Sequence, residues 1–437
     1  MKLWMSAVAF ITLCASPALA QNAGGLPGPE HEIARVAFLN AERIVVHGDV
    51  VHYRFDVAVG SGEFDVIRIH RVVKETAPGR PVKKMEGVLL LPGAPQLFEG
   101  IFMGVASPSA LPEEGSIALF LANNNVDVWG MDYGWTAVPH GYPDLSVMQG
   151  WGIEKDAEHT QTALSIARWM RATSGQGAGP IHLLGFSYGG FLVYAVAADD
   201  TQRPGNLKNV KGIIPVDGTT FKAANQAGDC NALPGIKAAL AAGTMAVDSS
   251  GNTVLGRAAI DDPGALSAVK LNALNPYFPA VPQFTFTNYQ AALATFVRSR
   301  FVGGTYEIVP PPSVDLYFTN GPRFVSLLAD SPPYAPYQWI YDSFASRCGS
   351  ADDPVAFDDH LGEITVPIFY IARQSAGLFT TSLTASDDVS SLIVNSTLNP
   401  SLYGHADFFL ADSAVNPADN AANKIWRPIL EWILAHY

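Results

Sequence analysis

Cysteine is scarce in this sequence, and its distribution excludes the common zinc sites. The 437 residues include three cysteines and ten histidines. They form no C-x-x-C pair and no H-E-x-x-H spacing, the patterns typical of structural zinc sites and zinc proteases. The sequence therefore predicts no metal site.

Basic residues and long apolar runs are also lacking. Lysine and arginine number 27 against 40 aspartates and glutamates, which gives a net charge of −13. This balance argues against binding to the phosphate backbone of nucleic acids. After the N-terminus no apolar run reaches the roughly 18 residues that a membrane helix needs. We therefore expect no nucleic-acid partner and no membrane span, and the oligomeric state stays open.

The first twenty residues have the features of a secretory signal peptide. Lys2 precedes a short apolar run, Val8–Cys14, and an A-x-A sequence follows at residues 18–20. A basic start, a short apolar run and a small-residue end are typical of a cleavable signal. We expect cleavage after Ala20 and a secreted or periplasmic protein that starts at Gln21. An uncleaved anchor is the alternative.

Hydrophobic patterning predicts a mixed sheet with helices between its strands. Residues 21–45 are expected to be an irregular lead-in, and residues 52–59 and 64–73 alternate in polarity, as antiparallel strands with one wet face do. Continuous apolar runs predict buried parallel strands at 87–91, 126–131, 181–184, 210–216 and 366–371. Helical patterns lie at 116–124, 156–173, 190–198 and the C-terminus, where Pro428 must kink the helix or lie in its first turn. This alternation indicates a doubly wound α/β fold.

Residues 219–365 interrupt the alternation of strands and helices and are rich in aromatic residues and proline. We interpret them as an inserted cap or lid on an α/β core of residues 21–218 and 366–437. An independent second domain is the alternative. In an exported protein Cys230 and Cys348 are expected to form a disulfide, and two separate buried thiols are the alternative.

The strongest motif is G-x-S-x-G at residues 185–189. It follows an apolar strand and opens a helix of small residues, the setting in which a serine stands on a sharp turn as a nucleophile. The glycines let strand and helix pass closely, and the turn lifts the hydroxyl out of the sheet. We therefore predict that Ser187 is a nucleophile. A glycine-rich turn with an ordinary serine is the alternative.

A serine hydroxyl needs a base to take its proton, and His405 is the best-placed histidine. It lies in the sequence Y-G-H-A-D at 403–407, after the last apolar segment and before the C-terminal helix. The other histidines fall in early strands, in loops, on a helix, in the expected cap or at the chain end. A histidine of an ordinary surface loop is the alternative.

The elbow at Ser187 and the loop of His405 together resemble those of α/β-hydrolase-fold serine esterases and lipases, whose chain order is Ser, Asp, His. The resemblance covers residues 50–217 and 366–437. It implies a mostly parallel, doubly wound sheet with antiparallel N-terminal strands and an inserted cap. It also implies a base on the loop after the last strand, as His405 would be.

The acid of such a triad does not stand where the resemblance first implies it. That position follows the strand at 366–371, and residues 372–377 hold no carboxylate. Some members of the fold place the acid one strand earlier, where Asp217 ends the run at 210–216. There it would accept the imidazole N–H and hold its tautomer. We predict Asp217, with Asp387 or Asp388 as alternatives.

An oxyanion hole requires two backbone N–H groups. Tyr188 should supply one, because it follows the nucleophile. The second should come from the loop after residue 91, where Ala94 is the best single candidate and the usual His-Gly is absent. The loop runs to Pro112, so another of its residues is an alternative.

These residues predict a secreted serine hydrolase that cleaves a carboxylic ester through an acyl-enzyme intermediate and needs no cofactor. The aromatic residues of the expected cap favour an apolar or aromatic small-molecule ester. An amidase, a polyester hydrolase or a catalytically silent binding protein of the same fold are the alternatives.

Overall fold

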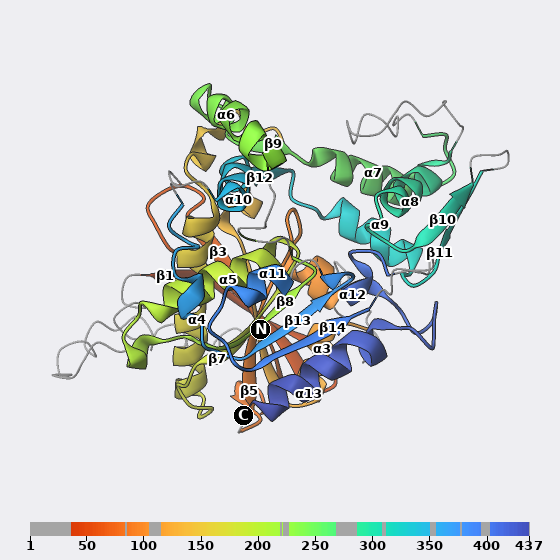
Figure 1. The fold of residues 1–437 in the computed structure, drawn as a ribbon. Helices are drawn as coiled ribbons and strands as arrows, with labels where there is room; N and C mark the ends of the chain where they lie inside the picture. Colours follow the sequence, from red (N-terminus) through yellow and green to blue (C-terminus); the bar gives the residue numbers. More distant parts are fainter. Residues whose placement is uncertain are drawn as a thin grey trace.

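The computed structural model describes residues 36–83, 85–104, 115–218, 221, 227–267, 286–307, 312–349, 355–375, 378–394 and 403–436. The signal peptide predicted at residues 1–20 lies outside them. A large central sheet carries helices on both faces, and a second group of elements lies to one side of it (Figure 1). Within the described residues no helix combines the length and the apolar character needed to cross a membrane.

The central sheet has ten strands, in the order β1-β2-β3-β6-β5-β7-β8-β13-β14, with β4 paired to β3. The strands β1, β2, β3 and β6 pair antiparallel, and every pair from β6 to β14 is parallel. Their bounds are β1 Ala37–His47, β2 Val50–Ala58, β3 Val66–Ala77, β4 Arg80–Pro81, β5 Glu86–Leu91, β6 Val126–Asp132, β7 Ile181–Phe186, β8 Val210–Val216, β13 Ile368–Ala372 and β14 Val389–Ile393.

This arrangement confirms the predicted mixed sheet and corrects one part of the prediction. The segment 21–45 is not irregular throughout, because β1 occupies Ala37–His47. As an edge strand β1 is mostly exposed, and Leu39 and Val45 are among its solvent-facing residues. Without a buried face the strand lacks the alternating pattern from which strands are recognised.

Helices cover both faces of the sheet. On one face α3 and α13 pack into a core with Phe186 and Val216; on the other α4 and α5 pack into a core with Leu89 and Leu183. Pro428 lies in the first turn of α13, one of the two predicted outcomes. The helices are α3 Ile117–Asn123, α4 Ile153–Thr173, α5 Tyr188–Thr201, α11 Leu378–Ser382, α12 Asp407–Leu410 and α13 Arg427–Ala435. Short 3-10 or π turns are η2 Glu99–Met103, η4 Gly134–Ala137, η5 Leu145–Met148, η6 Gly205–Leu207, η7 Leu361–Glu363 and η9 Ala422–Trp426.

The described residues between 227 and 349, which we call the insertion, form the second group of elements in Figure 1. Besides helices it contains two small antiparallel sheets, one formed by β9 and β12 and the other by β10 and β11. Its Phe324 and Leu328 belong to the same buried cluster as Phe186 of the central sheet. The elements are α6 Ala227–Ala241, β9 Ala246–Asp248, α7 Ser250–Asp261, α8 Asn288–Arg298, β10 Gly304–Glu307, β11 Ser313–Leu316, α9 Gly321–Ala329, β12 Tyr334–Pro336 and α10 Gln338–Cys348.

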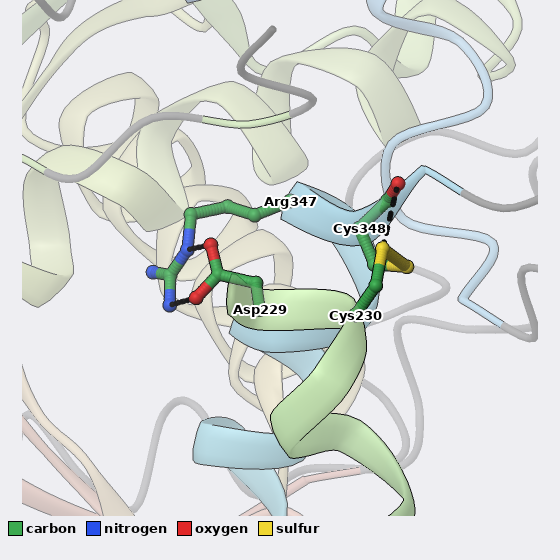
Figure 2. The surroundings of a disulfide bond; sticks show 4 residues. All are labelled: Asp229, Cys230, Arg347 and Cys348. Carbon is green, nitrogen blue, oxygen red and sulfur yellow. Dashed lines mark hydrogen bonds and ion pairs between the residues drawn. A yellow bond between two sulfur atoms is a disulfide. The ribbon is translucent and has the colours of Figure 1, made fainter. Parts of the chain in front are cut away.

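The predicted disulfide is present and joins the two ends of the insertion. Cys230 on α6 is bonded to Cys348 on α10, across 118 residues of sequence (Figure 2). Beside it Arg347 donates two hydrogen bonds to the carboxylate of Asp229, at 2.9 and 3.3 Å. The covalent bond and the ion pair therefore both hold α6 against α10.

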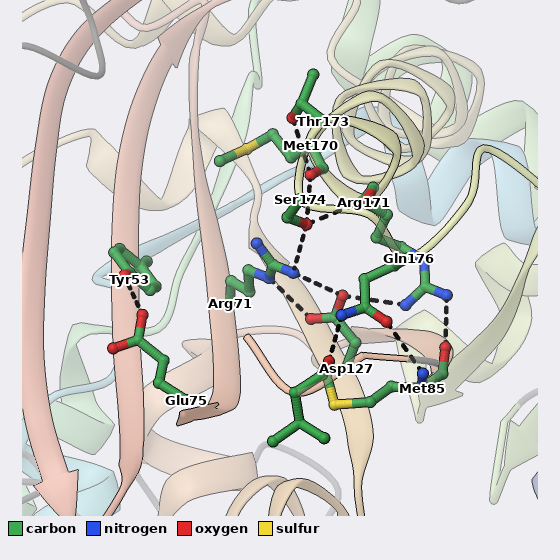
Figure 3. Close-up of polar contacts among 11 residues, drawn as sticks. Tyr53, Arg71, Glu75, Met85, Asp127, Met170, Arg171, Thr173, Ser174 and Gln176 are labelled. Atoms are coloured by element: carbon green, nitrogen blue, oxygen red, sulfur yellow. Dashed lines mark hydrogen bonds and ion pairs between the residues drawn. The ribbon is translucent and has the colours of Figure 1, made fainter. Parts of the chain in front are cut away.

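A buried ion cluster lies near the amino ends of the parallel strands. Asp127 of β6 is fully buried and accepts hydrogen bonds from Arg71 of β3 and Arg171 of α4, at 2.8 to 3.0 Å (Figure 3). Arg171 also donates to the carbonyl oxygen of Met85, at 2.7 Å. A buried carboxylate needs such partners, because desolvation of an unpaired charge costs several kcal/mol. The cluster fixes α4 against the sheet at the end opposite the predicted site.

Loss of the disulfide should destabilise the protein strongly. The double variant Cys230→Ser/Cys348→Ser should lower the free energy of unfolding by about 3–5 kcal/mol, because the bond closes a long loop in the unfolded chain. Urea denaturation measures this. Arg347→Ala is the matched control and should cost less than loss of the disulfide, because it removes a partly buried ion pair without opening the covalent loop. A thiol assay of the denatured, unreduced protein should find none of these cysteines free.

Candidate active site

Ser187 stands on a strained turn between β7 and α5. Its backbone angles are φ 55° and ψ −113°, a conformation that a residue with a side chain rarely adopts. A Cβ atom at Gly185 would lie 2.0 Å from the carbonyl oxygen of Gly189, and one at Gly189 would lie 2.3 Å from that of Leu91. Only glycine fits at either position, so the motif lets β7, α5 and β5 approach closely enough to hold the turn.

His405 lies on the segment that leads into α12, and the insertion holds its backbone. Its N–H donates to the carbonyl oxygen of Arg300, at 3.0 Å, and the next N–H donates to that of Phe301, at 2.6 Å. Fully buried Asp407 accepts hydrogen bonds from the N–H groups of Gly303 and Gly404 and from the hydroxyl of Thr319. Burial raises the pKa of Asp407 to about 6 although these hydrogen bonds oppose the shift.

Asp217 and His405 form a hydrogen-bonded pair. The Oδ2 atom of Asp217 lies 2.6 Å from Nδ1 of His405, and both side chains are largely buried. Asp217 directly follows β8 with φ 45°, and its N–H donates to the carbonyl oxygen of Ile371 on β13, at 2.7 Å. Because Nδ1 meets the carboxylate, Nε2 of the same ring is left to accept a proton.

Arg373 completes the surroundings of this carboxylate. Its Nε donates to Oδ2 of Asp217 at 2.7 Å, and its backbone N–H donates to Oδ1 at 3.1 Å. Burial alone would raise the pKa of Asp217, but the hydrogen bond with His405 and the charge of Arg373 lower it below the ordinary value. Asp217 therefore stays ionised at neutral pH. Its contribution to stability is lost only as the pH falls through the lowered pKa.

The turn at Ser187 and this pair meet at one edge of the sheet. The N–H of Ser187 donates to the carbonyl oxygen of Val216, the residue before Asp217, at 2.9 Å. The ring of Phe186 packs on the imidazole of His405, with 4.6 Å between centroids. Among the described residues the Ser187 hydroxyl has no hydrogen bond.

The two alternative carboxylates lie elsewhere. Oδ2 of Asp388 lies 3.1 Å from Nε2 of His436 near the C-terminus, and its side chain is exposed. Asp387 precedes β14 on the same exposed segment, and the carboxylate that meets His405 is that of Asp217. The structure therefore brings Asp217, and neither alternative, to His405.

Comparison with solved structures identifies the architecture. A protein of Sulfolobus solfataricus assigned as a lipase superposes with a TM-score of 0.61 at 18% identity, covering 91% of this chain and all of that one. This chain has the α/β-hydrolase fold. A soluble variant of monoglyceride lipase from Saccharomyces cerevisiae matches with a TM-score of 0.42 at 11% identity, over 92% of this chain and 96% of that one. No family model and no curated protein sequence matches.

In this α/β-hydrolase fold the loop after β5 lies against Ser187. A Cβ atom at Gly93 would lie 2.8 Å from Cβ of Ser187, so only glycine allows the approach. The N–H of Gln96 donates to the carbonyl oxygen of Gly93, at 2.9 Å. The carbonyl of Gly93 and the N–H of Ala94 belong to one trans peptide group, in which the two point in opposite directions. Because the Gly93 carbonyl points toward Gln96, the Ala94 N–H points away from Gln96. It has no acceptor among the described residues.

Tyr188 opens α5, and the first N–H groups of a helix have no partner within it. The assignment of Tyr188 and Ala94 as oxyanion donors stays a prediction. Further along, the loop predicted to continue to Pro112 is interrupted by η2 at Glu99–Met103. Residues 105–114 lie outside the described part, so no alternative donor there is placed.

One group within the described residues has the spacing of metal ligands: His52, His70 and Glu99. Nε2 of buried His52 lies 2.9 Å from Nδ1 of His70, whose Nε2 lies 3.0 Å from Asp132. Burial, followed by the charges of His70 and Arg54, lowers the pKa of His52 to about 2. Arg54 donates to the Glu99 oxygen that faces His52, at 3.1 Å, and its positive charge opposes a bound cation. These contacts describe a buried hydrogen-bonded chain better than a metal centre.

Two site residues were missed from the sequence. Arg373 follows β13, where the resemblance implied an acid, and its partner Asp217 follows β8, so no local pattern linked the two residues. Asp407, in the motif that carries His405, anchors the loop from within the core. Its role depends on contacts with the insertion, which no local pattern reveals.

Replacing the acid should abolish most of the turnover while the fold survives. Asp217→Asn keeps the shape of the side chain but favours the wrong imidazole tautomer, so kcat should fall by about 10³–10⁴-fold. Steady-state ester hydrolysis and circular dichroism measure the two effects. The matched control, Asp388→Asn, should retain full activity. Near-normal turnover of Asp217→Asn would refute its assignment as the acid.

Proposed function

We propose that this protein is an exported serine hydrolase that cleaves carboxylic esters, with Ser187, His405 and Asp217 as its catalytic triad. The observation that carries the proposal is the hydrogen bond between Asp217 and His405 beside the strained turn of Ser187. The three residues come from segments that are far apart in the sequence. Ser187 follows the carboxyl end of β7, Asp217 follows that of β8, and His405 lies on the segment after β14. Ligands of open α/β sheets bind at that edge.

The proposed reaction is acyl transfer in two steps. His405 removes the proton of Ser187 as the oxygen attacks the ester carbonyl, and the resulting imidazolium is stabilised by ionised Asp217. The N–H groups of Tyr188 and Ala94 bind the oxyanion. His405 then protonates the leaving alcohol, the C–O bond breaks and an acyl-enzyme remains. Water, deprotonated by His405, attacks this acyl group, and the protonated serine leaves with release of the acid. No cofactor is required.

Aromatic side chains near the triad favour an apolar or aromatic substrate. Phe301 of the insertion packs edge-on against His405, with 5.6 Å between ring centroids. Trp339 of α10 packs on Tyr188 at 5.5 Å. The ring of Phe301 therefore gives the surroundings of His405 an apolar character, which favours an apolar ester. The assignment of the Sulfolobus solfataricus protein of the same fold as a lipase agrees with this substrate class.

Export agrees with two features. Residues 1–20 have the pattern of a signal peptide, and the Cys230–Cys348 disulfide persists in oxidising compartments. The proposed location is therefore the periplasm or the outside of the cell.

Covalent labelling tests the nucleophile directly. A fluorophosphonate should modify the folded protein at one site and stop its hydrolysis of a p-nitrophenyl ester, because the serine oxygen attacks phosphorus as it attacks carbon. Ser187→Ala should abolish both the labelling and the activity. Ser146→Ala, at an exposed serine, is the control and should change neither. A folded protein that fluorophosphonate leaves unmodified would overturn the proposal.

A further inference from the structure

Asp156, on α4, is a buried carboxylate to which the mechanism above gives no role. Its side chain is 1% exposed, and its Oδ2 atom accepts hydrogen bonds from the hydroxyl of Tyr188, at 2.6 Å, and from Nε1 of Trp135, at 3.1 Å. Its Oδ1 atom has no partner among the described residues. One oxygen therefore joins side chains from α5 and from η4, the segment after β6.

The first of these contacts reaches a proposed oxyanion donor. The peptide N–H of Tyr188 follows the strained backbone of Ser187, and strained conformations persist only where the surroundings hold them. The ring of Tyr188 packs between Tyr133 and Trp339, at centroid distances of 5.4 and 5.5 Å, and Asp156 fixes its far end. Anchoring both ends of this side chain limits rotation of the peptide that carries the N–H.

The second contact leads to the other proposed donor. The ring of Trp135 stacks on Tyr133, with 5.4 Å between centroids and 8° between planes. The hydroxyl of Tyr133 donates to the carbonyl oxygen of Pro92, at 2.9 Å. Pro92 precedes Gly93 and Ala94, so this hydrogen bond holds the loop that lies against Ser187.

We propose that Asp156 is a positioning residue that holds both donors of the oxyanion hole through a shared acceptor oxygen. Tyr188 is held directly, and Ala94 is held through Trp135, Tyr133 and the Pro92 carbonyl. The inference rests on the proposed function, because it gives Asp156 a role only if an oxyanion forms at this place. Asp156 itself does not touch the reacting atoms.

The role requires an acceptor atom and not a negative charge. Burial raises the pKa of Asp156 to about 7, although the hydrogen bonds from Tyr188 and Trp135 and the charge of Lys155 oppose the shift. An asparagine at this position would keep an acceptor oxygen of the same shape without a charge. A leucine would leave the hydroxyl of Tyr188 and the indole N–H of Trp135 unpaired in the core.

The experiment compares these two substitutions with a matched control. Asp156→Asn should keep kcat within about threefold of the wild type. Asp156→Leu should lower kcat by about 10²-fold, the effect of a misplaced oxyanion donor. KM should change little in both. Asp200→Leu removes another buried carboxylate, from the far end of α5, and should reduce stability without this loss of kcat. Fluorophosphonate titration counts the folded sites, so kcat refers to competent enzyme.

An alkylboronic acid provides a readout that a purely structural role would not change. Its tetrahedral adduct with the serine places an oxygen in the oxyanion hole, so its Kd should rise in Asp156→Leu by about the factor by which kcat falls. Wild-type kcat and boronate affinity in Asp156→Leu would overturn the inference and leave the esterase proposal intact. If Asp156→Leu does not fold, Tyr188→Phe decides, because a normal kcat there would also overturn it. A wild-type protein without labelling or esterase activity would instead refute the proposed function.

Discussion

The close packing of β7 and α5 at Ser187 is the constraint on which the rest of the site depends. A residue with a side chain is held there at φ 55°, and this costs free energy that the surroundings must offset. The glycines at 185 and 189 allow the backbones to pass, and the Ser187 N–H bonds to the end of β8. The turn thus fixes Ser187 and the first N–H groups of α5, and it ties them to the end of β8 from which Asp217 follows.

The charge of Asp217 is stabilised by side chains that lie where the sheet meets the insertion. Asp217 is paired with His405 on one side and Arg373 on the other, and this pairing offsets the cost of its burial. The carbonyl oxygen of Arg300 accepts from both the His405 N–H and the Arg373 guanidinium. His405 and Arg373 therefore share a contact with the insertion, so the packing of the insertion and the geometry of the Asp217–His405 pair are linked.

Sequence patterns predicted the structure best where interactions between residues close in the sequence determine it. The buried parallel strands, the helix of α4 and the turn at Ser187 each follow from runs of neighbouring residues, and their positions agree with the structure. The prediction was wrong at β1, because an exposed edge strand has no buried face to mark it. The pairing of Cys230 with Cys348 was predictable from the small number of cysteines and the expected compartment.

By itself the sequence determined the sharp turn at Ser187, the alternation of buried strands and helices in the core, and a short set of candidate acids and bases. It did not decide among Asp217, Asp387 and Asp388, because the three lie near the ends of two strands and look alike in the chain. The tertiary structure brings Asp217 of these three to His405, because β8 lies between β7 and β13. The links through Arg373, Asp407 and Asp156 likewise arise only on folding, because their partners are distant in sequence.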